Sequence, residues 1–435
     1  MAVGPHAFTR STPAAGELAD HTRRRTAARL LPFLFILYIF NYLDRTSVAY
    51  AALGMSRDLG FSDRVIGLGA GIFFISYLAL QIPGALLVER WSARRAIAAI
   101  MIAWGSLTAL TALVHAPGEL YLARFVLGAA EAGFFPGVIV YLSHWFIRED
   151  RAKATSNFMA AIPLSFVIAS PLAGWILSHR WLGVDGWRWL FVLEGLPVIL
   201  LGMVAFFYLT DWPDEAAWLA PAERQWIEQT LEEEKPAHAR SITVWQALRS
   251  RTILLLGAVA FLDYWMAYSV MFWLPTILKR QSAFSDARVG LLGAVPYAAG
   301  FIAMLINGWH SDKSRERIWH SAVPLFVAAP ALLVLTSLPG STALTLVLFS
   351  LVIMAANMFL PVFWAIPTEI LGESAAAAGV GMVNAVGSAA GFAGPYAFGY
   401  LATRTGSLSY GLAVLMVSAL AGGILLVRIR GARRD

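Results

Sequence analysis

Two adjacent charged residues, Asp44 and Arg45, lie inside an apolar run that is long enough to cross a membrane. The run reads LLPFLFILYIFNYLDRTSVAYAAL and extends from Leu30 to Leu53. An ionised side chain in such a segment is costly unless it lines a cavity or finds a partner. The pair therefore either locks this segment to its neighbours or does chemistry. The simplest chemistry for a carboxylate beside a guanidinium is to carry a proton and to bind an anion.

Helix geometry separates the two side chains. Neighbouring residues of an α-helix point about 100° apart, so Asp44 and Arg45 cannot face the same spot. We therefore expect each of them to have its own partner.

A second acid–base pair, Arg124 and Glu131, lies in the apolar segment 119–143. A spacing of seven residues is nearly two helical turns, so both side chains project from one face, about 10 Å apart along the axis. Gly128 on that face leaves room for close packing or for a cavity. The pair is either a permanent ion pair between helices or a proton switch, because a buried carboxylate takes up a proton when its arginine partner leaves.

The composition places the chain among multi-spanning membrane proteins. It has 435 residues, of which 58% are hydrophobic and only 14% are charged, whereas soluble domains have about 25% charged residues. There is no cysteine, which excludes disulfides, thiolate catalysis and cysteine-bound metals. No Ser-His-Asp set and no metal-like spacing of histidines and acids can be assembled, so we expect no enzyme, no metal and no cofactor. The modest net charge of +6 is carried by loops and tails, which favours membrane topology over nucleic-acid binding.

The apolar segments predict an all-α membrane protein with two six-helix halves. The expected helices are 29–52, 66–88, 96–114, 119–143, 155–177, 187–209, 252–278, 288–309, 320–338, 342–366, 375–400 and 408–428. We expect 29–209 and 252–428 to form the two bundles, with 210–251 as a cytoplasmic linker between them. The polar residues 1–28 and 429–435 are expected to be cytoplasmic tails, the first of them disordered.

The basic residues predict the orientation. Loops on the side of the N-terminus carry about twice as many Lys and Arg residues as loops on the other side, and such residues mark the cytoplasmic face. Both termini are therefore expected in the cytoplasm, with the chain in the cytoplasmic (inner) membrane, as a monomer in the lipid bilayer.

A weak internal repeat relates the two halves. The loop ALLVERWSARR begins at Ala85 and the loop GWHSDKSRER at Gly308. Each places an acid, Glu89 or Asp312, four residues after a small residue and before a basic cluster. Such repeats are typical of transporters, and the first loop resembles the signature G-x-x-x-D-R-x-G-R-R of the major facilitator superfamily, although Ala85, Glu89 and Ser92 depart from it.

Further sequence blocks resemble the anion:cation symporter family within that superfamily. These blocks are NYLDR at 41–45, QIPG at 81–84, RFVLGAAEAGFFPG at 124–137, GWRWLFVLEGLP at 186–197 and GMVNAVGSAAGFAGPY at 381–396. The resemblance implies twelve transmembrane helices in two bundles around a central cavity, and secondary transport of organic anions, often coupled to protons.

The resemblance also implies roles for individual residues. Arg45 would bind the substrate carboxylate, Asp44 and Glu131 would take up protons, and Arg124 would control Glu131 or attract substrate. The other expected substrate-binding residues are Tyr42, Tyr77, Trp364 and Asn384. The expected gating residues are Glu89, Arg90, Arg94, Arg95 and Asp312, of which those in the first loop would hold the outward-open state through salt bridges between the bundles.

The substrate class follows from charge and pocket shape. Protonation of the buried acids removes charge that would otherwise have to cross the membrane, so a proton is the expected coupling ion. Pro163 stands where the sugar-acid carriers of the family place a glutamine, and 263–273 is rich in aromatic residues. We therefore expect a small or flat carboxylate, either a hydroxy acid such as tartrate or an aromatic acid. Asp263 is either a third ionisable site or, as we expect, a charge near the membrane interface, and Glu194 is expected near a helix end.

Other functions remain open. A sodium-coupled carrier, an exchanger or a uniporter of organic anions would also need Arg45, but not the proton. A membrane-embedded sensor is the remote alternative, because the linker and tails are too short to hold a signalling domain.

Overall fold

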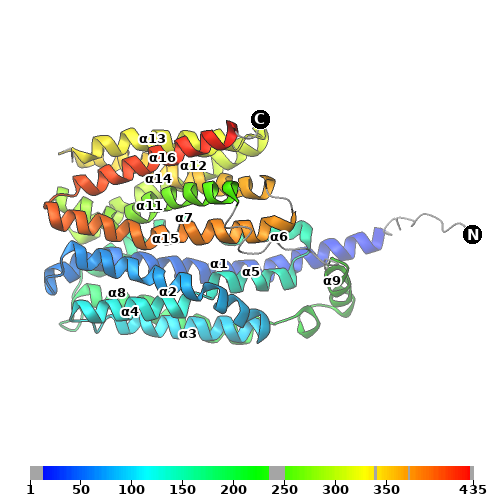
Figure 1. Cartoon of the computed structure of the whole chain (residues 1–435). Coiled ribbons are helices and arrows are strands. Elements are labelled where there is room, and N and C mark those ends of the chain that lie inside the picture. The colour runs from blue at the N-terminus through cyan, green and yellow to red at the C-terminus, as the bar shows by residue number, and fades with distance from the viewer. Residues whose placement is uncertain (1–12, 235–249, 338–339, 371–372, 432–435) are drawn as a thin grey trace, which may run out of the picture.

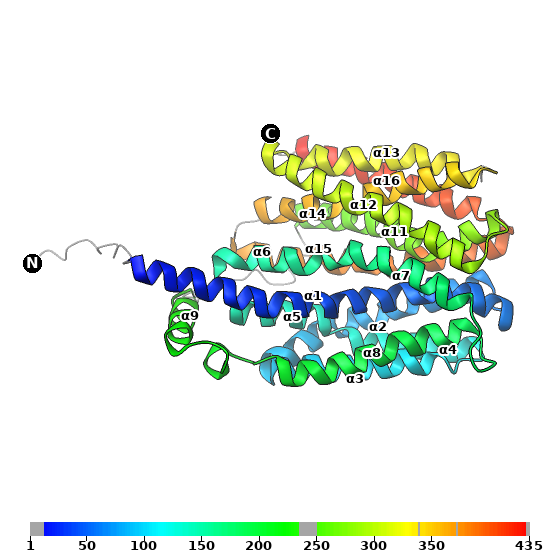
Figure 2. The same ribbon diagram turned by 180° about the vertical axis from the view of Figure 1, so that it is seen from behind.

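The chain folds into long, roughly parallel helices, seen from two sides in Figures 1 and 2. The structure is a computed structural model and describes residues 13–234, 250–337, 340–370 and 373–431. The first half contains α1 (Pro13–Asp58), α2 (Asp63–Arg90), α3 (Ala93–Thr111), α4 (Pro117–Glu131), α5 (Phe134–Trp145), α6 (Arg148–Met159), α7 (Ala161–Leu177) and α8 (Gly186–Tyr208). After η1 (Pro213–Glu215) and α9 (Pro221–Glu233), the second half contains α11 (Arg251–Gln281), α12 (Asp286–Ser314), α13 (Ile318–Thr336), α14 (Thr342–Ile370), α15 (Glu373–Thr405) and α16 (Ser409–Gly431).

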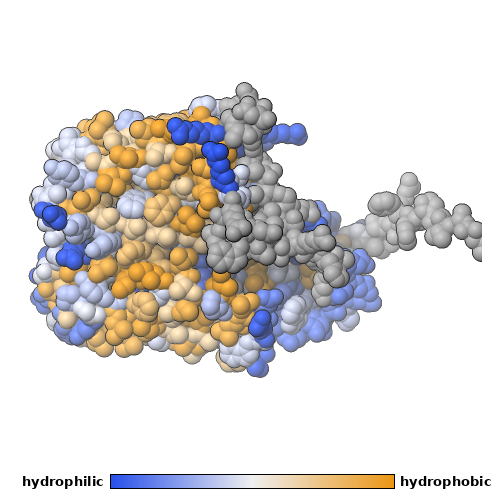
Figure 3. Space-filling view, viewed as in Figure 1, coloured by the Kyte–Doolittle hydropathy of each residue, from blue (hydrophilic) through white to orange (hydrophobic). Residues whose placement is uncertain are grey.

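The helices account for all twelve expected spans. Within the described residues, 11 helical segments are long and apolar enough to cross a membrane, and α15 is the twelfth, a 33-residue helix with many glycines and alanines. The fold is therefore the expected all-α membrane fold with two six-helix halves. On the face seen in Figure 3, apolar residues cover the middle of the molecule and polar residues gather at its ends. Both termini lie at one end of the helices (Figure 1).

Two of the spans are interrupted helices. The fourth span consists of α4 and α5, and the break between them follows directly after Glu131. The fifth consists of α6 and α7, separated at Ala160. Pro163 explains the second break, because proline lacks the amide hydrogen that would bond to the carbonyl group of Met159.

Small residues bring the two halves together at the end opposite the termini. A methyl group on Gly67 would lie 2.7 Å from the carbonyl oxygen of Pro395, and one on Gly174 would lie 2.7 Å from Cα of Gly290. Only glycine permits such close backbone approach. α2 therefore packs tightly on α15, and α7 on α12.

Ion pairs join the halves at the same end. Arg57 Nη2 lies 2.5 Å from Asp286 Oδ2, and Arg280 pairs with Asp63. Each pair joins a residue of the first half to one of the second. This end of the molecule is therefore closed.

Replacing Asp286 with asparagine is expected to favour opening of this end. The pair with the half-exposed Arg57 contributes about 1 kcal/mol, which corresponds to roughly a fivefold change in the population of the open state. Because the chain contains no cysteine, a single cysteine at the buried Val289 reports the change through its reaction rate with a membrane-impermeant maleimide. Asp185→Asn is the control, because Asp185 pairs with Arg180 inside one loop. An unchanged rate in Asp286→Asn would contradict this assignment.

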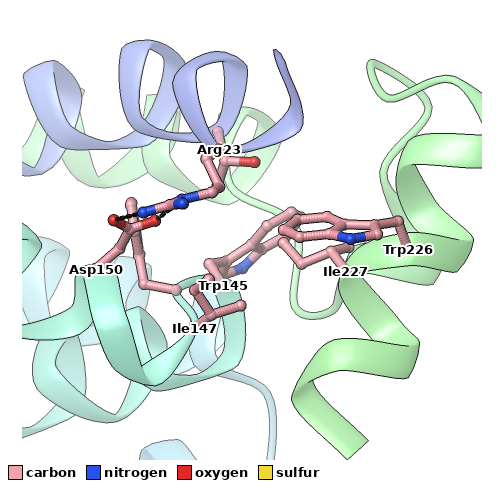
Figure 4. Close-up of a pocket in the computed structure, with 8 residues that line it drawn as sticks. Arg23, Trp145, Ile147, Asp150, Trp226 and Ile227 are labelled. Atoms are coloured by element: carbon pink, nitrogen blue, oxygen red, sulfur yellow. Dashed lines mark hydrogen bonds and ion pairs between the residues drawn. The ribbon is translucent and has the colours of Figure 1, made fainter. Parts of the chain in front are cut away.

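The N-terminal segment is ordered from Pro13, which corrects the expectation that all of residues 1–28 are disordered; residues 1–12 lie outside the described part. Its order comes from contacts with α6 and α9. Arg23 donates two hydrogen bonds to Asp150, of 2.6 and 2.7 Å, beside a water-sized cavity of about 10 Å³ lined by Trp145 and Trp226 (Figure 4). The apparent tail is thus an extension of the first helix. Polar composition did not indicate this, because its partners lie far away in the sequence.

The buried Glu223 of α9 fixes the same segment. It lies 2.7 Å from His21 Nδ1 and 3.1 Å from Arg25 Nη1. Burial alone would raise the pKa of Glu223, but the hydrogen bonds from the amide of Ala220 and from His21, with the charge of Arg25, outweigh burial and lower it. An acid with a lowered pKa stabilises the fold above its unfolded pKa, and that stability is lost as the pH falls through the folded value.

We expect Glu223→Gln to lower the melting temperature of the solubilised protein at pH 7. Hydrogen bonds to a charged group contribute about 1.5–3 kcal/mol each at most. The wild-type melting temperature should fall more steeply than that of the variant when the pH is lowered below about 4.5. Glu228→Gln, an exposed change on the same helix, is the control. Equal acid sensitivity in wild type and Glu223→Gln would show that Glu223 does not stabilise the segment.

Candidate functional site

Four charged side chains are buried together in the first half. Asp44, Arg45, Arg124 and Glu131 are each at most 5% exposed. They come from the middle of α1 and from α4, so they lie inside the membrane-spanning part. Burial of this kind requires partners for the charges, and the partners show how the site is built.

Asp44 and Arg45 have separate partners, as their helical geometry predicts. Thr108 Oγ1 on α3 donates a 2.6 Å hydrogen bond to Asp44 Oδ1. Arg45 Nε and Nη2 donate hydrogen bonds of 2.8 and 2.5 Å to Glu131 Oε1. Both acids keep a second buried oxygen without a hydrogen-bond partner in the described residues, which leaves a place for a proton.

The partner of Glu131 differs from the expected one. Its guanidinium partner is Arg45 of α1, whereas the spacing within α4 had indicated Arg124. The spacing gave the correct helix face, but the seven-residue separation leaves Arg124 too far along the axis for contact. The rotation of α1 instead turns Arg45 towards Glu131.

Arg124 is a buried guanidinium with unused donors. Nε, Nη1 and Nη2 have no hydrogen-bond partner within the described residues, although its guanidinium carbon lies 4.8 Å from the ring centre of Phe73. Asp44 and Glu131 are the negative charges that act on it. These unused N–H donors could bind an incoming anion.

Aromatic rings surround Arg45. Its guanidinium carbon lies 4.7 Å from the ring centre of Tyr77 and 5.1 Å from that of Tyr42. Both tyrosines were expected at the site, and the structure brings both of them to Arg45. Cation–π contacts of this kind hold a guanidinium in a dry environment.

The second half contributes a neighbouring aromatic group. Tyr268 packs at 4.7 Å on Phe74 of α2, and Trp364 Nε1 donates a 3.3 Å hydrogen bond to Tyr264 Oη. Asn384 lies three residues before Gly387, where an added methyl group would touch the ring of Tyr264. Trp364 therefore contacts Tyr264, Asn384 lies on α15 one turn from the point where that helix meets Tyr264, and Tyr268 connects this group to the first half.

The expected gating residues lie at the end that carries the termini, outside this cluster. Glu89, Arg90 and Arg95 are exposed. Arg94 binds Asp211 through its backbone amide at 2.8 Å, and Asp312 pairs with Arg317 at 2.5 Å. These two contacts do not join the two bundles.

Three further residues complete the site or correct its outline. Thr108 was not expected, because a threonine in an apolar helix usually bonds to its own backbone. Asp263 is 1% exposed in the middle of α11, not at the interface as expected. Glu194 is 3% exposed and lies eight residues inside α8, not near its end. Both residues are buried by the packing of neighbouring helices, which the apolar sequence pattern did not indicate.

Comparison with known proteins identifies the family. The model described as Major Facilitator Superfamily matches residues 34–395. The chain belongs to this superfamily. A relative from Agrobacterium vitis whose name designates it a tartrate transporter is 39% identical over 93% of this chain and 94% of its own length. A quinolone resistance transporter from Acinetobacter baumannii is 36% identical over 92% of this chain and 93% of its own.

Solved structures agree on the fold. A bacterial homologue of the human lysosomal transporter Spinster, described as inward-facing and unoccupied, superimposes with a TM-score of 0.73 at 20% identity, covering 93% of this chain and 95% of that chain. This major facilitator protein is therefore a multi-pass membrane transporter and not an enzyme, as the sequence predicts. The resemblance to the superfamily is confirmed.

Proposed function

We propose that this protein is a proton-coupled symporter of a small organic anion that works by alternating access. The observation that carries the proposal is the pairing of Arg45 with Glu131. In this pair the protonatable Glu131 occupies the guanidinium group of Arg45 inside the membrane-spanning part. An incoming anion would have to compete with Glu131 for that group. No further cofactor is needed.

The pairing couples substrate to proton in a simple way. A substrate carboxylate can take the place of the Glu131 carboxylate on Arg45, because Nε and Nη2, which both donate to Glu131 Oε1, can instead bind the two oxygens of the substrate. Glu131 then loses its cationic partner in a buried site, which favours its protonated form. Anion and proton therefore bind together, and the loaded carrier has the same net charge at this site as the empty one.

Asp44 adds a second place for a proton, next to Arg124. Its hydrogen bond with Thr108 leaves one oxygen free. Arg124, with its unused donors, would be a second cationic anchor for an anion that has bound at Arg45. Asp44 would take up a proton when the anion binds Arg124.

The substrate is proposed to be a carboxylate that fits among tyrosines. Tyr42, Tyr77 and Tyr268 offer hydroxyl groups and flat faces beside Arg45, which suits either a hydroxy acid or an aromatic acid. The names of the two relatives indicate tartrate and quinolones as compounds to test. Trp364 and Asn384 would contact the far end of the substrate from the second half.

Alternating access is supported by the closed end. Because the end opposite the termini is closed by Arg57–Asp286 and by the glycine contacts, substrate would exchange with the side that carries the termini. We propose that this side is the cytoplasm and the membrane the inner membrane, and that the protein acts as a monomer.

Uptake by proteoliposomes tests the proposal. Purified protein is given labelled tartrate, a benzoate and a quinolone, each with an inward proton gradient, an inward sodium gradient or neither. The proposal predicts accumulation of a carboxylate with the proton gradient and its loss with a protonophore. Accumulation driven by sodium alone, or equal distribution under all gradients, would instead indicate a sodium-coupled carrier or a uniporter.

A further inference from the structure

Glu194 is a buried acid that the proposed cycle does not use. It is 3% exposed, and neither of its carboxyl oxygens has a hydrogen-bond partner in the described part of the chain. A carboxylate buried in this way without a partner costs several kcal/mol. Its protonated form avoids that cost and gains an O–H donor.

The helix packing places Glu194 in the same layer as Asp44. The next residue, Gly195, lies against Gly105 of α3, where an added methyl group on Gly105 would be 2.7 Å from the Gly195 carbonyl oxygen. Three residues after Gly105, Thr108 donates its hydrogen bond to Asp44. The contact between α3 and α8 thus brings Glu194 within about one helical turn of the partner of Asp44.

Asp44 is the ionisable group that faces Glu194. α8 packs on α1, α3 and α7. α7 carries no ionisable side chain, and the ionisable residues of α3, Arg94 and Arg95, lie at its first turn, far from Thr108. From α1, the charge of Asp44 acts on Glu194, while Arg45 turns to Glu131.

Two neighbouring acids cannot both be ionised in a dry site without a large cost. Protons on such a pair are held by the pair and not by either residue alone. In this structure Asp44 accepts from Thr108, as an ionised acid does, and Glu194 has no donor. This arrangement favours the proton of the pair on Glu194 in this state.

We propose that Glu194 is a further proton-binding residue of this transporter, which shares a proton with Asp44 across the contact between α1, α3 and α8. The proposal deepens the proposed function, because the shared proton would enter the same transport cycle. It predicts that Asp44 and Glu194 titrate as one unit.

Infrared difference spectroscopy on protein in membranes tests the site without any substrate. At pH 7 the wild-type spectrum minus the Glu194→Gln spectrum should contain the carbonyl stretch of a protonated carboxyl group, because the contributions of other buried acids such as Asp263 cancel. Glu194→Asp should restore a shifted band, and Glu119→Gln, an exposed acid on α4, should leave the band unchanged. A difference spectrum without this band would overturn the proposal whether or not the protein transports organic anions.

The pH profile of transport tests whether the proton is used. Glu194→Gln removes one of the two sites of the shared proton, so the pH profile of uptake should change in Glu194→Gln and return towards that of the wild type in Glu194→Asp. A lower rate with an unchanged pH profile would show that Glu194 is only structural. If Glu194→Gln does not fold, the shift of the carboxyl band between the wild type and Glu194→Asp tests the proposal instead.

Discussion

Replacing Arg45 with alanine is expected to reduce substrate uptake about 100-fold or more. The change removes both bidentate donors for the anion and leaves Glu131 buried without its partner, and truncating one member of a buried charge pair costs about 2–5 kcal/mol. Arg45→Lys should retain only a small part of the activity, because an ammonium group is a point charge and cannot make the two parallel bonds. Initial rates of labelled uptake in proteoliposomes measure the effect.

The control for this prediction is Arg180→Ala. Arg180 is exposed in the loop before α8 and pairs with Asp185, so its loss should leave uptake near the wild-type level. Near-normal uptake in Arg45→Ala would show that the anion is held elsewhere, and Arg124 would be the next residue to test.

Replacing Glu131 with glutamine is expected to separate exchange from accumulation. Glutamine keeps the shape of the side chain but cannot take up a proton, so a proton gradient should no longer drive accumulation. Exchange of external labelled for internal unlabelled substrate should persist, because Arg45 is freed from a competing carboxylate. Apparent substrate affinity in exchange should rise for the same reason.

Glu119→Gln is the matched control on the same helix. Glu119 is exposed and accepts hydrogen bonds from the amides of His115 and Ala116, so it can affect the start of α4 but not the buried site. If Glu131→Gln accumulates substrate as well as wild type, the proton does not travel through Glu131.

The helices and the buried charges could be predicted from the sequence because each depends on local information. Twenty apolar residues in a row indicate a span, and the 100° between Asp44 and Arg45 follows from helix geometry alone. Both expectations are confirmed. The ordered segment from Pro13 is different, since its order depends on Asp150 and Glu223, more than 100 residues away.

The pairing within the site could not be read from spacing. Residues seven apart on α4 suggested that Arg124 pairs with Glu131, but the partner is set by how α1 rotates against α4, which is a property of the packed bundle. Thr108 was missed, and Glu194 was misplaced near a helix end, for a related reason. Their roles depend on Gly105 and Gly195, which let α3 and α8 approach closely at the level of Asp44.

The central claim is that an anion replaces Glu131 on Arg45 and thereby makes Glu131 take up a proton. The most direct measurement is proton uptake by the purified protein when substrate is added in weakly buffered solution. We predict that substrate binding is accompanied by proton uptake in the wild type, and that Glu131→Gln binds the same substrate with less proton uptake. Substrate binding with equal proton uptake in both proteins, or with none in the wild type, would contradict the claim.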